Sequence, residues 1–153
     1  AWSRYQDYCA PESTSCGPVL SLADAGGFLL RRFLVDGKAA ALPESVVGLI
    51  ERVWGMIGHP FVALHVAGLY LTAADEGGLH RCREAISSSP SGTYRELALS
   101  LVDAVTHFGA GGYQDAHRIL ESISSEERVG IGGSNVEREL IELVEQECGT
   151  RSS

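Results

Sequence analysis

A glycine turn ahead of the last predicted helix is the first place where the sequence could bind a ligand. Gly132 and Gly133 precede Ser134, and Arg138 follows one helical turn later. Glycines before a helix expose backbone N–H groups, and the helix dipole favours an anion there. Arg138 could add its charge to a bound phosphate or carboxylate. The alternative is a capped helix start in which Arg138 bonds the preceding hairpin, because the segment is no Walker motif and no strand is predicted before it.

The histidines and cysteines form no recognisable catalytic or metal-binding pattern. No HxxxH or HExxH pair exists among the five histidines, although His107 and His117 would lie on the two helices of one hairpin. The chain has no Gly-x-Ser-x-Gly elbow and no CxxC pair. We therefore expect a non-enzyme with no catalytic residue, no metal and no cofactor. Four sparse cysteines also predict reduced, mostly buried thiols and a cytoplasmic protein.

Composition excludes several classes of protein. The 153 residues are 44% hydrophobic, enough for one folded domain with a sizeable core. The net charge of −8 argues against binding to nucleic acid or to an anionic membrane, both of which need clustered Lys and Arg. No apolar stretch approaches the ~20 residues of a membrane span. The aromatic start, with Trp2 and Tyr5, indicates either a segment that packs on something upstream or a chain that has lost its initiator Met.

The elements that must position these residues are helices, because strand signals are nearly absent. The predicted helices cover about 17–35, 43–57, 60–75, 78–88, 93–109, 113–124 and 134–148. Residues 1–16 are expected to be irregular or to pack on an upstream segment. In 93–109, an apolar stripe repeats at helical spacing through Leu97, Leu101 and Val105.

Helix ends carry their own signals. Pro43 and Pro60 suit a first helical turn. Thr93 with Glu96 predicts a capping box, as does Ser134 with Glu137. Glycines at 37, 58, 77–78 and 111–112 mark expected stops. Short connections between these helices predict antiparallel packing of neighbours.

Two of the turns are related by a 34-residue offset. Gly111-Gly112-Tyr113-Gln114-Asp115-Ala116 aligns with Gly77-Gly78-Leu79-His80-Arg81-Cys82. In each copy a large residue follows the glycines, a small residue comes three positions later, and a larger apolar residue, Ile86 or Leu120, fills the next layer. A further step back reaches Ser45 and Gly48 without the turn glycines, so a third unit is weaker.

This pattern resembles the tetratricopeptide repeat, whose period is 34 residues. Ala104 falls where the family has a small residue on the first helix, whereas Ser100 and Asp103 replace its usual Trp and Leu. The repeats are therefore degenerate. The resemblance implies an all-α fold of antiparallel helical hairpins stacked as a short TPR-like α-solenoid of about seven helices.

A narrower resemblance lies at the final predicted helix. Ile131-Gly132-Gly133-Ser134-Asn135, followed by Glu137-Arg138-Glu139-Leu140, is similar to a stretch near the end of the tetratricopeptide repeat protein 38 family. That family is longer, so the resemblance implies one helical domain over 1–153 that forms the C-terminal part of a larger solenoid. It transfers no catalytic residue.

The function expected from such an array is a non-catalytic protein–protein interaction module or scaffold. Its partner would be another protein or the remaining repeats of a longer chain. We predict contact residues on the first helices of the hairpins at His65, Tyr70, Arg95 and His107. An accessory enzyme subunit with a small molecule between its helices, or a structural C-terminal cap of a solenoid, are the alternatives. A pocket that gathers His65, Tyr70 and His107 would favour the accessory subunit.

Overall fold

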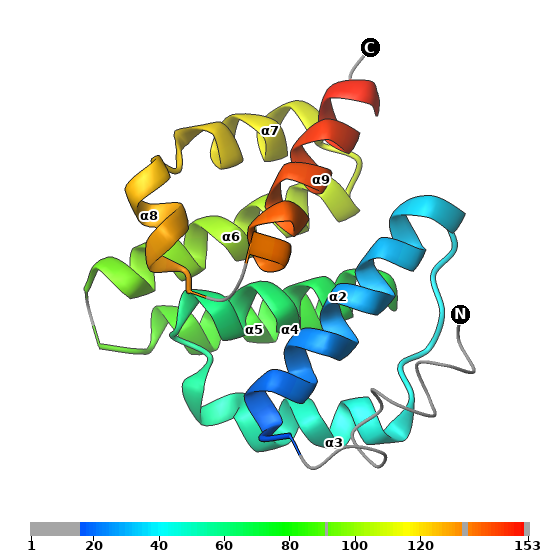
Figure 1. Cartoon of the computed structure of the whole chain (residues 1–153), viewed down its shortest axis with the longest axis vertical. Coiled ribbons are helices and arrows are strands. Elements are labelled where there is room, and N and C mark those ends of the chain that lie inside the picture. Colours follow the sequence, from blue (N-terminus) through cyan, green and yellow to red (C-terminus); the bar gives the residue numbers. More distant parts are fainter. Residues whose placement is uncertain (1–15, 91, 133–134, 152–153) are drawn as a thin grey trace.

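The computed structural model describes residues 16–90, 92–132 and 135–151, and the regular structure of these residues is entirely helical (Figure 1). The all-α prediction is therefore confirmed. Within the described ranges, eight α-helices and one 3₁₀ turn follow each other in the order α2 (Pro18–Asp36), α3 (Glu44–Val53), η1 (Trp54–Met56), α4 (Pro60–Thr72), α5 (Glu76–Ser87), α6 (Thr93–Gly109), α7 (Tyr113–Ser122), α8 (Ser125–Gly130) and α9 (Asn135–Arg151). No helix of these ranges combines the length and apolar character needed to cross a bilayer.

Helical hairpins stack on one another through their first helices. The helices α4 and α5 form one antiparallel hairpin and α6 and α7 form the next, while α3 packs on α2. The helices α2, α4 and α6 pack side by side. The last helix, α9, packs mainly on α7 and also contacts α2, as Figure 1 shows. The two ends of the array are thereby brought together around one hydrophobic core.

Helix α4 is the centre of this core. Every residue from Pro60 to Thr72 is buried, and the segment contains no Lys, Arg, Asp or Glu. A helix that is apolar all round must be enclosed by protein, because it has no polar face for solvent. Glycines let its neighbour α2 approach closely: a Cβ at Gly26 would lie 3.1 Å from Cδ2 of His65.

The 34-residue offset corresponds to matching positions on α5 and α7. Cys82 and Ala116, the small residues, are both fully buried where the second helix meets the first. Ile86 and Leu120 are buried one turn later. The third unit does not share this packing, because Gly48 on α3 is exposed and a Cβ there would meet open space.

Several predicted helix ends were wrong. Gly92 is the N-cap of α6, and no side-chain cap bond is formed there, so Thr93 and Glu96 make no capping box. Gly77 and Gly78 lie inside the first turn of α5, whose N-cap is Asp75. The chain turns instead at Ala74, which has a φ of 52°. The Ser134–Glu137 prediction falls on residues whose side chains lie outside the described part.

Helix α8 was not predicted. It has six residues and begins with a complete capping box: the Ser124 hydroxyl accepts from the Glu127 N–H, and the Glu127 carboxylate accepts from the Ser124 N–H. These backbone and hydroxyl donors lower the pKa of Glu127. Arg128 then joins α8 to α9 through a two-pronged ion pair with Glu145, with Nη1 at 3.1 Å from Oε2.

Candidate interaction groove

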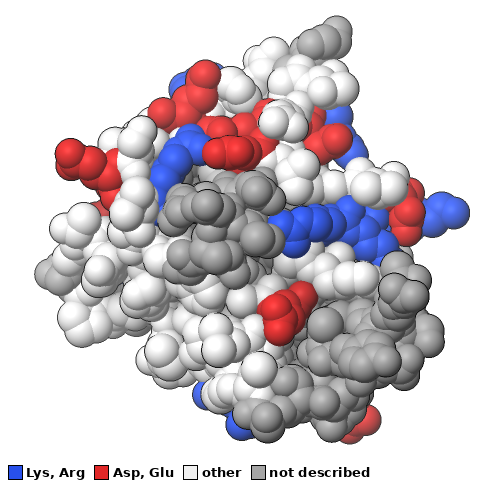
Figure 2. Space-filling view, in the orientation of Figure 1, with Lys and Arg blue, Asp and Glu red and all other residues white. Residues whose placement is uncertain are grey.

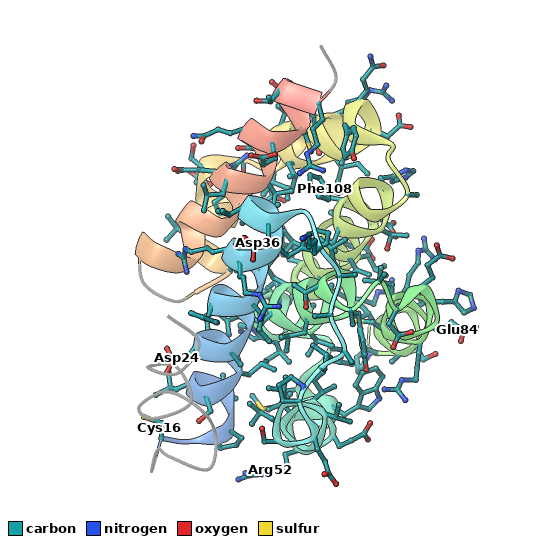
Figure 3. All side chains as sticks on the ribbon, turned by 90° about the vertical axis from the view of Figure 1, so that its right-hand side faces the viewer. Cys16, Asp24, Asp36, Arg52, Glu84 and Phe108 are labelled. Atoms are coloured by element: carbon teal, nitrogen blue, oxygen red, sulfur yellow. The ribbon has the colours of Figure 1, made fainter. Side chains whose placement is uncertain are left out.

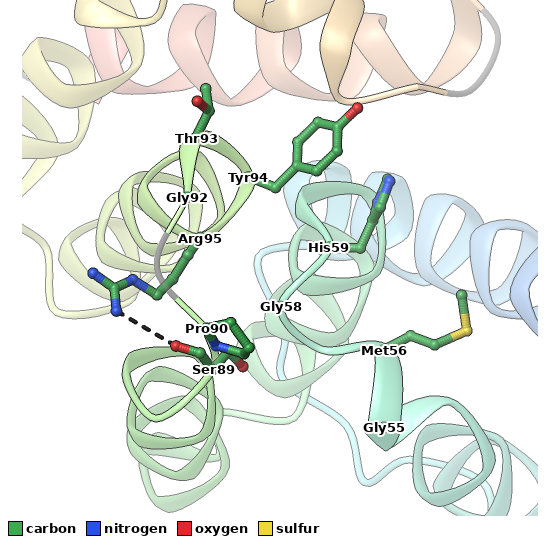
Figure 4. A pocket seen from close by; sticks show the side chains of 10 residues that line it. All are labelled: Gly55, Met56, Gly58, His59, Ser89, Pro90, Gly92, Thr93, Tyr94 and Arg95. Carbon is green, nitrogen blue, oxygen red and sulfur yellow. Dashed lines mark hydrogen bonds between the residues drawn. The ribbon is translucent and has the colours of Figure 1, made fainter.

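An open hollow lies where the turn before α4 faces the connection between α5 and α6. Its volume is about 840 Å³. The lining comes from two segments that are far apart in the sequence: Gly55, Met56, Gly58, His59, Ser89, Pro90, Gly92, Thr93, Tyr94 and Arg95 (Figure 4). We call this hollow the groove. It forms because α4 and α6 run side by side and begin at the same end of the array.

An aromatic pair forms one side of the groove. His59 is the N-cap of α4, and its Nδ1 accepts a hydrogen bond from the Phe61 N–H at 3.3 Å. The neutral imidazole therefore carries its proton on Nε2. The Tyr94 ring, from the first turn of α6, lies 5.1 Å from the His59 ring, centroid to centroid. Figure 4 shows the two rings side by side at the edge of the groove.

Apolar surface is exposed beside this pair. The side chain of Met56 is 51% exposed and that of Tyr94 is 54% exposed, although both are large and hydrophobic. Tyr and Met are enriched at protein interfaces, because they supply contact area that adapts to a partner. The exposed Met56 and Tyr94 therefore make this side of the groove suited to contact with another protein.

Arg95 lies at the opposite side and its charge is locally balanced. Its Nη2 donates to Oε1 of Glu96 at 2.8 Å, and its Nη1 donates to the carbonyl oxygen of Ser89 at 3.4 Å. Figure 4 shows the second bond. The groove is thus close to neutral, and its character is apolar and aromatic with hydrogen-bonding groups.

The predicted contact residues do not share one surface. Arg95 lines the groove and His107 is exposed near the turn between α6 and α7, at the other end of α6. His65 and Tyr70 were wrong as surface residues, since they are only 2% and 5% exposed. Both lie on α4, which is enclosed by other helices. Nδ1 of His65 donates to the Phe61 carbonyl oxygen at 2.7 Å within that helix.

The predicted anion-binding turn stays a prediction. Gly132 has a φ of 86°, the left-handed conformation that glycine tolerates. Gly133 and Ser134 lie outside the described residues, and so does the side chain of Arg138.

A second polar cluster was missed by the sequence analysis. Arg81 of α5 donates from Nη2 to the Tyr70 hydroxyl, and its guanidinium lies 4.6 Å above the Trp54 ring. Burial raises the pKa of Tyr70, an effect that the bond from Arg81 partly opposes. The same hydrogen bond raises the pKa of Arg81. The three residues come from η1, α4 and α5, so no local spacing could have joined them.

The described cysteines and acidic residues do not line the groove, although Glu96 bonds Arg95 at its side. Cys82 lies on the buried face of α5, and burial raises the pKa of its thiol to about 12. Burial likewise raises the pKa of Cys148 on α9. Acidic side chains gather on one face over α7, α8 and α9 (Figure 2), and Glu126 and Glu142 are among the exposed ones. Seen from the side in Figure 3, charged side chains project outward from the ribbon.

Comparison with known proteins adds no relative to this description. The chain matches no protein-family model, no curated protein and no solved structure.

Proposed function

We propose that this chain is a non-catalytic protein–protein interaction module, of the tetratricopeptide type, that holds a segment of another protein in the groove. The carrying observation is the exposed Met56 and Tyr94 beside His59 in a hollow of about 840 Å³. An exposed aromatic side chain and a methionine together in a concavity favour a partner's apolar side chains.

The accessory-subunit alternative receives less support. It required a pocket that gathers His65, Tyr70 and His107. The first two are buried in α4, and His107 is exposed at the far end of α6. The groove is also open rather than closed around a small molecule.

The local charge favours an uncharged partner segment. Because Glu96 balances Arg95, the groove offers no strong attraction to an acidic peptide. The His59 Nε2–H, the Tyr94 hydroxyl and the backbone at Gly92 can bond the main chain of an extended segment. A scaffold role and a cytoplasmic location belong to the same proposal.

Co-purification from the native source tests this function. Tyr94→Ala and Met56→Ala remove the exposed side chains of the groove, and Val35→Ala is the matched control because Val35 is 85% exposed on α2. Removal of a central interface side chain costs about 2 kcal/mol, which corresponds to a roughly 30-fold loss of affinity. We expect a partner chain with the wild type and with Val35→Ala, and its loss with Tyr94→Ala. Monomeric recovery of the wild type, or full retention by both groove variants, would refute the proposal.

A further inference from the structure

A crevice on another part of the surface combines opposite charges with an apolar wall. It lies between α3 and α5, over the C-terminal end of α4, and has a volume of about 280 Å³. Its lining residues, none of which line the groove, are Leu42, Val47, Ile50, Glu51, Tyr70, Ala73, Asp75 and Arg81.

The positive group of the crevice is held in a fixed position. Arg81 lies over the Trp54 ring, and its Nη2 is 2.5 Å from the Tyr70 hydroxyl and 3.4 Å from Oε1 of Glu51. Within the described part of the chain, all hydrogen bonds of this guanidinium use Nη2. Nε–H and Nη1–H lie on different edges of the guanidinium plane, so either of them can donate one hydrogen bond to a ligand carboxylate beside the positive charge of Arg81.

The negative side is formed by Asp75 and Glu51. Oδ1 of Asp75 accepts the Gly78 N–H at 2.8 Å as the cap of α5, which leaves Oδ2 as an acceptor. The preceding residue, Ala74, has a φ of 52°, a left-handed conformation that is uncommon for a non-glycine residue. Strain of this kind persists where the surrounding structure requires a particular backbone path. The C-terminal end of α4 adds partial negative charge at the same place.

The apolar wall lies beside these charges. Ile50 is buried, Leu42 is half-buried and Val47 is 45% exposed. A ligand's aliphatic group placed there would cover the exposed part of Val47.

We propose that this crevice binds one free amino acid with an aliphatic side chain. Its carboxylate lies on Arg81, its ammonium group lies between Asp75 and Glu51, and its side chain lies on Leu42, Val47 and Ile50. A simple anion would be repelled by the two carboxylates, and a simple cation would compete with Arg81. The volume of about 280 Å³ lies just below the range of about 300–1,000 Å³ that is typical of pockets for drug-sized ligands, which limits the occupant to a small molecule. This site is independent of the groove and of the interaction proposed there.

Titration calorimetry of the full chain with L-leucine tests the proposal. L-leucine methyl ester lacks the carboxylate and N-acetyl-L-leucine lacks the ammonium group, so each should bind at least tenfold more weakly than L-leucine. Equal binding of L-leucine and both blocked forms would overturn the zwitterion assignment. An absence of binding by L-leucine, L-isoleucine and L-valine up to their solubility would overturn the site.

Matched variants locate the binding. Asp75→Asn keeps the cap oxygen for Gly78 and removes only the charge, and Arg81→Gln removes the carboxylate partner. The control is Arg83→Gln, two residues further along α5, whose ion pair with Asp103 lies outside the crevice. We expect a tenfold or greater loss for the first two and no change for the control, with far-UV circular dichroism as the test of folding. If Arg81→Gln unfolds, Asp75→Asn decides: an affinity equal to that of Arg83→Gln would refute the proposal.

Discussion

Two adjacent glycines in the first turn of α5 should respond in opposite ways to the same substitution. At Gly77 a new Cβ would meet only Oδ1 of Asp75, at an ordinary 3.5 Å. At Gly78 a Cβ would overlap the Tyr70 ring, with Cε1 at 2.6 Å. That ring cannot move aside easily, because Tyr70 is 5% exposed and its hydroxyl is bonded by Arg81.

The magnitudes follow from general values. Replacing glycine by alanine in a helix stabilises it by up to about 1 kcal/mol, so Gly77→Ala should raise the free energy of unfolding by roughly 0.5–1 kcal/mol. At Gly78 the same gain is opposed by overpacking, which typically costs about 1–3 kcal/mol and occasionally more. We expect a net loss of about 1–2 kcal/mol for Gly78→Ala, and thus a difference of about 1.5–3 kcal/mol between the two variants.

Urea unfolding followed by far-UV circular dichroism measures both values. A double variant that adds Tyr70→Leu to Gly78→Ala should recover about 1 kcal/mol relative to the sum of the single changes, because residues in contact are not additive. A Gly78→Ala protein as stable as Gly77→Ala would refute the packing of α5 on α4 described above.

Three further predictions concern other parts of the chain. Arg128→Gln should lower the free energy of unfolding by about 1–3 kcal/mol, because Arg128 bonds Glu145 and the carbonyl oxygens of Leu120 and Ile123. The control is Arg118→Gln, whose ion pair is exposed. It should change the free energy of unfolding by less than ~0.5 kcal/mol in the same urea assay. Burial raises the pKa of Cys82 from 9.0 in the unfolded chain to about 12 in the folded one, so the stability that comes from burying the neutral thiol is fully present below pH 9 and is lost as the pH rises from 9 towards 12. Between pH 8.5 and 10 the free energy of unfolding of the wild type should fall by about 1 kcal/mol more than that of Cys82→Ala. Parallel pH profiles of the two proteins would contradict this. Ser124→Ala should destabilise α8 by about 1 kcal/mol, because it removes the hydroxyl that accepts the Glu127 N–H. Hydrogen exchange should show a faster-exchanging Glu127 amide, and an unchanged rate would contradict the cap.

The sequence predicted the helices well where periodicity was strong. The apolar stripe of α6 and the small residues Cys82 and Ala116 lie where helical spacing placed them, because burial of a face is a local signal. Helix α8 escaped notice because six residues are too few for a stripe, although Ser124 and Glu127 carry the capping spacing.

Positions that depend on the stacking of helices were not predictable in the same way. His65 and Tyr70 were assigned to an open face from helix order alone, yet the absence of any Lys, Arg, Asp or Glu between Pro60 and Thr72 already indicated an enclosed helix. The groove joins Met56 and His59 to Tyr94, and the crevice joins Glu51 to Arg81. These pairs are about 30–40 residues apart, so only the packing of hairpins reveals them.

Site-specific photo-crosslinking tests the interaction groove most directly. A photoreactive residue placed at Met56 or Tyr94 in the full chain lies in the groove, and one placed at Val35 lies on an exposed part of α2 outside it. We predict that irradiation in the native source gives the same covalent partner chain at both groove positions and not at Val35. No adduct at either groove position, or the same adduct at Val35, would contradict the groove as the contact surface.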